Sequence, residues 1–160
     1  MGEVIHLEEI TEDNFEAVIA MKRPEDEHFV ASNCYSLAQA WLYRNDNDVF
    51  PYAIYLDDTP VGFILLEEDA KERELWIWRI KFPEEHANKG YGSAAIRLVI
   101  DHAKTKLNKY DDLCVDCAIT NERARHVYEK LGFRKSGRIN HGDEEMRLPL
   151  HSHEADERTA

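Results

Sequence analysis

The sequence lacks long apolar runs, is poor in cysteine, and has far fewer basic than acidic side chains. No stretch approaches the ~18 consecutive apolar residues from which a membrane-spanning helix is built. The first residues, Met1 to His6, lack the basic and apolar regions of a signal peptide. We therefore expect a cytoplasmic protein without a membrane partner.

The scarcity of cysteine argues against both a disulfide framework and a metal site. The chain has 3 cysteines, an odd number. Cys114 and Cys117 have the spacing of a redox or metal half-site, but they lie in an apolar run typical of a strand. Residues three apart on a strand point to opposite faces, and no second cysteine pair completes a zinc site. We predict buried or half-buried thiols and no metal.

The shortage of basic residues limits the classes of molecule that the protein is expected to bind. With 20 basic and 32 acidic residues the formal charge is −12. Such a chain repels phosphate backbones, so we expect no nucleic-acid partner, whereas a cationic substrate is attracted. The charge also serves solubility alone. A length of 160 residues with 43% hydrophobic content predicts one domain over residues 1–150, followed by a flexible polar tail at 151–160.

Apolar periodicity and turn residues predict a chain that mixes helices and strands. Helices are expected to start at Thr11, Ser36 and Gly92 and after Asn121. Tight turns are expected at 57–60 and 140–143. Strands are predicted at residues 4–7, 50–56, 61–66, 75–82, 113–119, 134–139 and 145–150.

A glycine-bearing turn joins the strand at 75–82 to the helix at 92–106. Glycine lets the backbone approach a ligand closely, and the first N–H groups of a helix are free to bind an anion. Such a turn is also typical of a plain strand–helix connection. The pattern predicts a phosphate site on the backbone of Lys89, Gly90, Tyr91, Gly92 and Ser93.

A second segment lies downstream, with the spacing Asn-x-x-Ala-x-x-hydrophobic-Tyr-x-x-x-Gly-Phe. It consists of Asn121, Ala124, Val127, Tyr128, Gly132 and Phe133. With the glycine turn, it resembles the GNAT superfamily of N-acetyltransferases, whose phosphate motif reads Gln/Arg-x-x-Gly-x-Gly/Ala. Ala87 stands at the Gln/Arg position, so a side chain that helps to bind pyrophosphate is missing there. The resemblance implies an α/β (α+β) fold, with a mixed sheet splayed between its fourth and fifth strands and acetyl-CoA in the splay.

The resemblance also implies a reaction, acetyl transfer to a primary amine by direct attack in a ternary complex. Backbone N–H groups near Ile80 and Phe82 would polarise the thioester carbonyl. Tyr128 would protonate the departing thiolate, and Asn121 would bond the pantetheine arm. From the residues alone, Tyr128 packs on Phe133 and Asn121 caps a helix; these alternatives stay open.

The base that deprotonates the amine is less clear. The family often places a glutamate on the fourth strand, where this sequence has Trp76. Glu74, two residues earlier and hence on the same strand face, is the catalytic candidate; a solvated edge carboxylate is the alternative. Glu67 and Glu68 on the neighbouring strand are further candidates. Trp78 offers an acceptor cation an aromatic wall or fills the core, and Arg79 needs a partner, which we expect to be a buried carboxylate.

The acceptor is suggested by similarity to a bacterial branch that includes spermine/spermidine acetyltransferases. The similar segments are 29–40, 76–80 and 142–146. The acidic cluster Glu25, Asp26 and Glu27 would receive a polyamine, or is a plain solvated loop. Another small-molecule or protein N-terminal amine, and a non-catalytic acetyl-CoA sensor, are the alternative functions. The oligomeric state stays open, a homodimer being one alternative.

Overall fold

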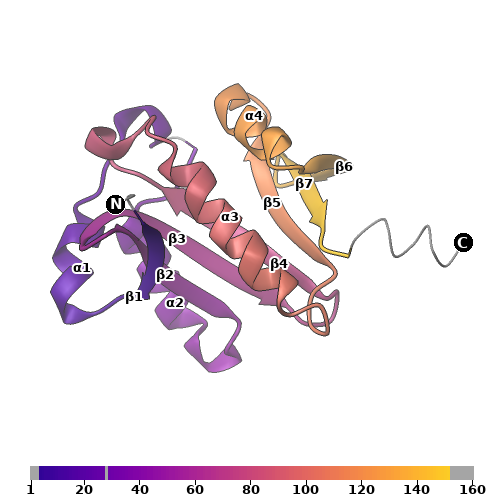
Figure 1. Ribbon diagram of the computed structural model, residues 1–160, viewed down its shortest axis with the longest axis horizontal. Coiled ribbons are helices and arrows are strands. Elements are labelled where there is room, and N and C mark those ends of the chain that lie inside the picture. The colour runs from indigo at the N-terminus through magenta and orange to yellow at the C-terminus, as the bar shows by residue number, and fades with distance from the viewer. Residues whose placement is uncertain (1–3, 28, 152–160) are drawn as a thin grey trace, which may run out of the picture. The chain divides into compact units, whose positions relative to one another are not determined.

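The fold is described for residues 4–27 and 29–151 of a computed structural model (Figure 1). The described residues confirm the predicted seven strands and four α-helices and add three short 3-10 helices. In chain order the elements are β1 (Ile5–Glu9), α1 (Glu12–Ile19), η1 (Pro24–Asp26), α2 (Asn33–Leu42), η2 (Arg44–Asp46), β2 (Val49–Leu56), β3 (Thr59–Asp69), β4 (Glu74–Lys81), η3 (Glu84–His86), α3 (Tyr91–Lys104), β5 (Asp112–Ala118), α4 (Glu122–Lys130), β6 (Arg134–Asn140) and β7 (Asp143–Pro149).

The seven strands form one mixed sheet in the order β1-β2-β3-β4-β5-β7-β6. The chain divides into two compact units, each built from two stretches of sequence. The first unit holds the residues up to Glu67 and Ile77–Leu98; the second holds Glu68–Trp76 and the residues from Val99 on. β3, β4 and α3 therefore contribute residues to both units.

In the first unit, β1, β2 and β3 pair antiparallel, with Ile5 opposite Leu56 and Val49 opposite Glu67. The β2–β3 turn is tighter than predicted. Thr59 pairs with Leu56, so Thr59 and Pro60 belong to β3 rather than to the turn. The turn bends at Asp57, whose φ is 53°, a conformation that Asp tolerates better than most residues.

An apolar cluster holds the first unit together. Val18 and Met21 come from α1 and the segment after it, and Ala53, Phe63 and Leu65 from β2 and β3. Leu37 and Ala40 of α2 pack against this cluster. Removing a large aliphatic or aromatic side chain from water stabilises the fold by roughly 1.5–3 kcal/mol, so this cluster fixes both helices on β2 and β3.

The helix starts in the first unit are set by polar caps. α1 begins after Thr11, as predicted, and its Asn14 side chain accepts from the Thr11 N–H at 2.8 Å. The predicted start of α2 at Ser36 is wrong. Ser32 caps this helix, because its extended backbone places the hydroxyl 3.1 Å from the Tyr35 N–H that it accepts. Ser36 is buried inside the helix instead.

In the second unit, β5 pairs with β7 and β7 with β6, all antiparallel (Figure 1). The predicted β6–β7 turn is confirmed: His141 and Gly142 both have positive φ, the pattern of a type I′ hairpin turn. Cys114 and Cys117 are both buried in β5, as predicted. Burial raises the pKa of the Cys117 thiol to about 11, so this thiol is protonated and unreactive near neutral pH.

None of the helices in residues 4–27 and 29–151 has the length and apolar character that crossing a membrane requires. Of the predicted tail, His151 is described: its Nε2 lies 2.9 Å from the Asp111 carboxylate. The prediction for 152–160 lies outside the described residues.

Candidate functional site

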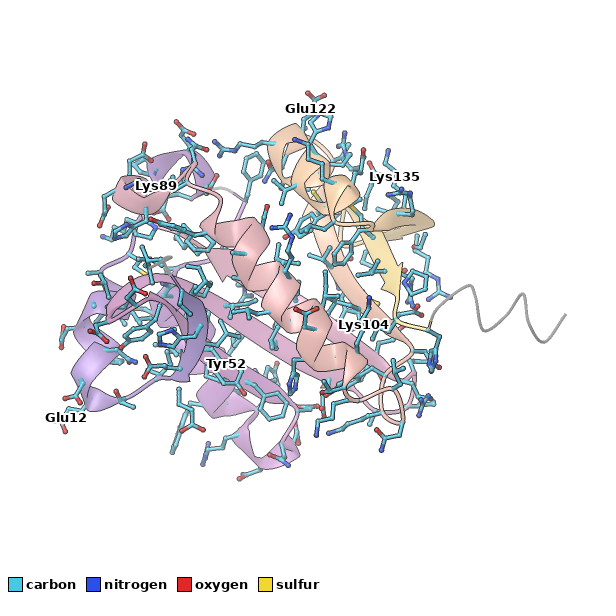
Figure 2. All side chains as sticks on the ribbon, in the orientation of Figure 1. Glu12, Tyr52, Lys89, Lys104, Glu122 and Lys135 are labelled. Atoms are coloured by element: carbon cyan, nitrogen blue, oxygen red, sulfur yellow. The ribbon has the colours of Figure 1, made fainter. Side chains whose placement is uncertain are left out.

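The predicted phosphate loop lies in the first unit, where η3 leads into α3. Asn88 and Gly90 have positive φ, 59° and 82°, and turn the chain into the helix at Tyr91. The N–H of Ala94 donates to the Gly90 carbonyl at 3.1 Å and closes the first helical turn. The N–H groups of residues 91–93 thus precede the intrahelical ladder and can bind an anion. Figure 2 shows Lys89 in the segment that leads into this turn.

Glycine is required for different physical reasons at different positions of this region. A Cβ on Gly90 would meet nothing within 4 Å, so this position needs glycine for its positive φ. A Cβ on Gly92 would lie 3.4 Å from the Phe82 ring, and one on Gly62 of β3 would lie 2.5 Å from it. The Phe82 ring therefore lies between Gly62 and Gly92. The sequence prediction assigned Gly92 to the ligand alone and missed Gly62.

The two residues whose backbone would polarise a carbonyl lie at the end of β4. Ile80 is inside this strand and Phe82 follows its last residue, Lys81. The packing of Phe82 between the two glycines holds the backbone at this strand end in place. The polarising role itself stays a prediction.

Tyr128 lies in the second unit on α4. It is 6% exposed, and its ring packs edge to face on that of Phe133, with 5.5 Å between the ring centroids. The packing alternative is thus confirmed, which leaves a further chemical role open. Burial, with a smaller effect from nearby Cys117, raises the pKa of the Tyr128 phenol above its usual range. The phenol is therefore protonated at neutral pH and retains a proton to donate.

Asn121 caps α4, as predicted. Its side-chain oxygen accepts from the Ala124 N–H at 3.2 Å. The cap uses the oxygen only, so the side-chain NH₂ group is the part of Asn121 that suits a carbonyl acceptor such as the pantetheine arm.

Glu74 is buried rather than a solvated edge residue. One carboxylate oxygen accepts from the Trp76 indole N–H at 3.1 Å, and the other lies 2.5 Å from Arg147 Nη1. Arg147 also pairs with Glu145 at 2.7 Å and Asp112 at 3.2 Å. Accepting a proton would cost Glu74 this ion pair, so the arrangement favours a structural role over catalysis. Sequence reasoning missed Arg147.

The alternative bases, Glu67 and Glu68, lie in the last three residues of β3. Glu68 lies 2.8 Å from Lys109 Nζ and accepts from the Tyr110 hydroxyl. Glu67 pairs with Val49 in the β2–β3 ladder.

The acidic segment Glu25–Glu27 is not a free cluster of carboxylates. The Arg23 side chain, 9% exposed, reaches Glu25 at 3.5 Å, Asp26 at 3.4 Å and Glu84 at 3.5 Å. The N–H of Glu84 also donates to the Lys22 carbonyl at 3.1 Å. Arg23 therefore ties the acidic segment to η3, which leads into the phosphate loop.

Lys81 holds the third carboxylate. Its side chain is 1% exposed, and its Nζ lies 3.4 Å from Glu27. Arg23 and Lys81 together contact four carboxylates, those of Glu25, Asp26, Glu27 and Glu84. Sequence reasoning missed both cations, although Arg23 directly precedes the acidic segment.

Trp78 is half-buried against the apolar cluster of the first unit, and its ring lies 6.3 Å from that of Tyr43. The cation that it meets is Arg79, whose guanidinium lies 4.8 Å from the ring. The prediction of a carboxylate partner for Arg79 is wrong: none of the described residues supplies one. Arg79 Nη1 donates to Ser36 Oγ at 3.1 Å and to Gln39 Oε1 at 2.5 Å instead.

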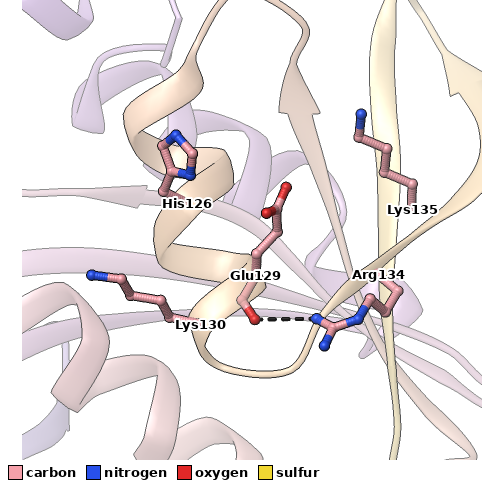
Figure 3. A pocket seen from close by; sticks show the side chains of 5 residues that line it. All are labelled: His126, Glu129, Lys130, Arg134 and Lys135. Carbon is pink, nitrogen blue, oxygen red and sulfur yellow. Dashed lines mark hydrogen bonds between the residues drawn. The ribbon is translucent and has the colours of Figure 1, made fainter.

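A shallow pocket beside α4 contains none of the predicted site residues (Figure 3). Arg134 donates from Nη1 to the Glu129 carbonyl at 3.2 Å and so caps the end of α4. The side chains that line the pocket are His126, Glu129, Lys130, Arg134 and Lys135. All five are solvent-exposed, which is typical of a surface depression rather than of a catalytic centre.

Comparison with known proteins identifies the family. The model of the acetyltransferase (GNAT) family matches residues 7–133, most of the chain. This chain belongs to the GNAT family. The prediction from the two motifs is therefore confirmed, together with the fold that it implied.

The curated relatives of this GNAT acetyltransferase include polyamine enzymes. A spermine/spermidine N(1)-acetyltransferase of Bacillus subtilis (strain 168) is 22% identical over 149 residues, which cover 89% of this chain and 95% of the relative. A spermidine N(1)-acetyltransferase of Escherichia coli (strain K12) is 32% identical over 91 residues, 56% of this chain and 48% of the relative.

Solved structures share the GNAT fold at low identity. A spermidine N-acetyltransferase from Vibrio cholerae, in complex with CoA and spermine, superposes with a TM-score of 0.70 at 18% identity, covering 89% of this chain and 92% of that one. The PaiA N-acetyltransferase from Thermoplasma acidophilum, with coenzyme A, gives a TM-score of 0.66 at 17% identity, covering 91% and 99%.

Proposed function

We propose that this GNAT protein transfers an acetyl group from acetyl-CoA to a primary amine by direct attack in a ternary complex. The observation that carries this proposal is the start of α3, where Gly90 turns the chain with positive φ and the N–H groups of residues 91–93 precede the helical ladder. Backbone groups of Lys89, Gly90, Tyr91, Gly92 and Ser93 hold the pyrophosphate. Because Ala87 supplies no polar side chain, these backbone amides carry most of this contact.

The chemical step forms one bond and breaks another. The amine nitrogen attacks the thioester carbon, the C–N bond forms, and the C–S bond breaks with the electron pair on sulfur. Backbone N–H groups of Ile80 and Phe82 stabilise the negative charge that develops on the carbonyl oxygen. The protonated, buried phenol of Tyr128 gives its proton to the thiolate, and the NH₂ group of Asn121 binds the pantetheine arm.

The amine must lose a proton before or during attack. Glu74 is the carboxylate that we predict from the sequence for this role, but its ion pair with Arg147 supports proton loss to water instead. The two routes differ in one variant. If Glu74 is the base, Glu74→Gln lowers turnover at neutral pH, and turnover recovers as rising pH deprotonates the amine in solution. If water takes the proton, the folded variant keeps the pH profile of the wild type.

We propose a polyamine as the acceptor. The named activities of the Bacillus subtilis and Escherichia coli relatives support this choice, as do the three consecutive acidic residues Glu25, Asp26 and Glu27. A polyamine carries several spaced ammonium groups, which spaced carboxylates attract. Half-buried Trp78 adds an aromatic surface for a cation.

The test of the function is thiol release from acetyl-CoA on addition of spermidine. The proposal expects free CoA to form only when enzyme, acetyl-CoA and amine are all present. A sensor domain, the alternative function, binds acetyl-CoA in calorimetry yet releases no thiol. That result would leave the GNAT fold in place and remove the enzyme activity.

Self-association is a further part of the proposal. A Vibrio cholerae spermidine N-acetyltransferase is dodecameric in one structure, which supports an oligomer here, with a homodimer as its smallest form. Light scattering over a dilution series distinguishes this from a monomer.

A further inference from the structure

Arg79 is a cation on β4 that no carboxylate of the described residues neutralises. Its Nη1 donates to two neutral oxygens, Ser36 Oγ and Gln39 Oε1. Two aromatic rings flank the guanidinium, Tyr35 at 5.4 Å and Trp78 at 4.8 Å. These contacts orient the group and leave its charge uncompensated.

The neighbouring cations of the first unit behave differently. Arg23 contacts three carboxylates, and Lys81 contacts Glu27. Taking a guanidinium partly out of water without a counter-charge is unfavourable. Burial lowers the pKa of Arg79 below its ordinary value, which shows this cost, yet an arginine keeps its charge at neutral pH.

The free edge of Arg79 suits an anion. A guanidinium has five N–H groups, and both hydrogen bonds of Arg79 start from Nη1. Nε and Nη2 have no hydrogen-bond partner within residues 4–27 and 29–151, and Arg79 is half-buried, so that solvent reaches it. These two nitrogens form the edge of the guanidinium fork that binds a carboxylate through two parallel hydrogen bonds. Ser36 and Gln39 fix the plane of the fork and thereby preorganise it.

A negative group lies on the same side of β4. Arg79 and Lys81 are two residues apart on this strand, so their side chains share a face about 6–7 Å apart. Lys81 holds Glu27, whose side chain is nearly half exposed. A free cationic edge and a half-exposed carboxylate thus occupy one stretch of the strand. An acceptor that matches both has a carboxylate and a second ammonium group.

We propose that Arg79 is a subsite for a carboxylate of the acceptor, and that among diamines of equal length the enzyme prefers those that are also amino acids. This inference rests on the proposed function and specifies its acceptor: a diamine that also carries a carboxylate, that is, a diamino acid. The acetyl transfer itself is unchanged: the amine distal to the carboxylate attacks the thioester.

Matched acceptors isolate the carboxylate. L-lysine is cadaverine plus one carboxylate, and L-ornithine is putrescine plus one carboxylate. Thiol release gives kcat/KM for each, and the wild type is expected to favour each amino acid over its diamine by roughly tenfold or more. The overall charge of −12 attracts the dicationic diamines more strongly, so a preference for the amino acids cannot come from the global field.

The variants decide whether Arg79 carries the preference. Arg79→Gln is expected to abolish it while leaving kcat/KM for the diamines near the wild-type value; Arg79→Lys, which keeps the charge but not the fork, is expected to retain part of it. Arg44→Gln removes an exposed cation that stacks on Trp41 and is the matched control, with the preference unchanged. If Arg79→Gln does not fold, the loss of most of the preference in Arg79→Lys supports the subsite.

Two outcomes overturn the proposal: a wild type that does not favour the amino acids, or an Arg79→Gln variant that weakens amino acids and diamines equally. If no acceptor is turned over at all, the proposed function fails, and calorimetry still tests Arg79. L-lysine that binds the wild type more tightly than cadaverine, with the difference lost in Arg79→Gln, supports the subsite. Equal binding contradicts it.

Discussion

Two groups of charged side chains, one in each compact unit, are paired differently. In the second, Arg147 sits among three carboxylates at 2.5–3.2 Å, and Arg73 pairs with Asp111 at 3.1 Å. In the first, Arg23 and Lys81 stand 3.4–3.5 Å from their carboxylates, and Arg79 has no carboxylate among the described residues. We propose that the charges of the second unit serve structure and that those of the first serve recognition.

The largest expected effect is on stability in the second unit. Arg147→Ala leaves Glu74 and Glu145 buried without their cation, and removing one partner of a buried pair costs about 3–5 kcal/mol. Urea unfolding followed by circular dichroism measures this loss. Arg138→Ala on the exposed face of β6 is the control and is expected to change stability by less than about 0.5 kcal/mol. Equal stability of the two variants would contradict the structural role of Arg147.

The next effect tests whether the second unit also contributes chemistry. Tyr128→Phe removes the phenolic proton and keeps the ring on Phe133, so acetyl-CoA affinity stays near the wild-type value. Turnover is expected to fall roughly 10²-fold, the usual scale for losing a positioned acid. Steady-state kinetics and calorimetry give the two quantities.

A second tyrosine provides the matched control. Tyr110→Phe removes a buried hydroxyl that bonds Glu68 in the same unit, so it is expected to lower stability without lowering turnover. An unchanged kcat in Tyr128→Phe, with chemistry shown to limit the rate, would reduce Tyr128 to a packing residue.

A pH dependence distinguishes the close pairs of the second unit from ordinary surface charges. Burial alone would raise the pKa of Glu145, but hydrogen bonds from Arg147, Ser136 and Asn140 bring it down to about 2, from an ordinary 4.5. The stabilisation from this group is complete above about pH 4.5, where both native and unfolded chains are ionised, and is lost as pH falls toward 2. Unfolding free energies from pH 6 to 2.5 should therefore fall more steeply for wild type than for Glu145→Gln. Parallel curves would refute the assignment.

The smallest effect concerns the loose pairs of the first unit. Glu25, whose side chain is 64% exposed, is the carboxylate of this segment that can be neutralised at least cost to the fold. Glu25→Gln is expected to raise KM for spermine by up to about fivefold, because an ion pair with an exposed partner contributes only ~0.2–1 kcal/mol. KM for a monoamine of similar length should change less. The spermine advantage should shrink with added salt, which screens exposed charges over ~10 Å at 0.1 M. A salt-independent advantage would contradict recognition by this segment.

Local signals in the sequence were sufficient for most of the fold. Alternating apolar residues located the strands, and Asn121 identified the start of α4 because an N-cap acts within three residues. The same signal misplaced α2, since Ser32 and Ser36 both qualify as caps and only the backbone conformation decides between them.

The candidate site was less predictable because its partners are distant in sequence. Lys81 and Glu27 are 54 residues apart, and nothing near either residue reveals the pair. Glu74 reads as an edge carboxylate until Arg147 is placed beside it. Gly62 lies in no turn and has no positive φ. Glycine is required there because the Phe82 ring leaves no room for a Cβ. Motifs that act through the local backbone were recognised, and contacts that depend on tertiary packing were not.

The most direct test of the central claim is mass spectrometry of spermidine after incubation with the protein and acetyl-CoA. The account predicts monoacetylated spermidine in a one-to-one ratio with released CoA, and none when the protein is omitted. Intact acetyl-CoA and unmodified spermidine, in the presence of a folded protein shown to bind acetyl-CoA, would contradict it if other primary amines also remain unmodified.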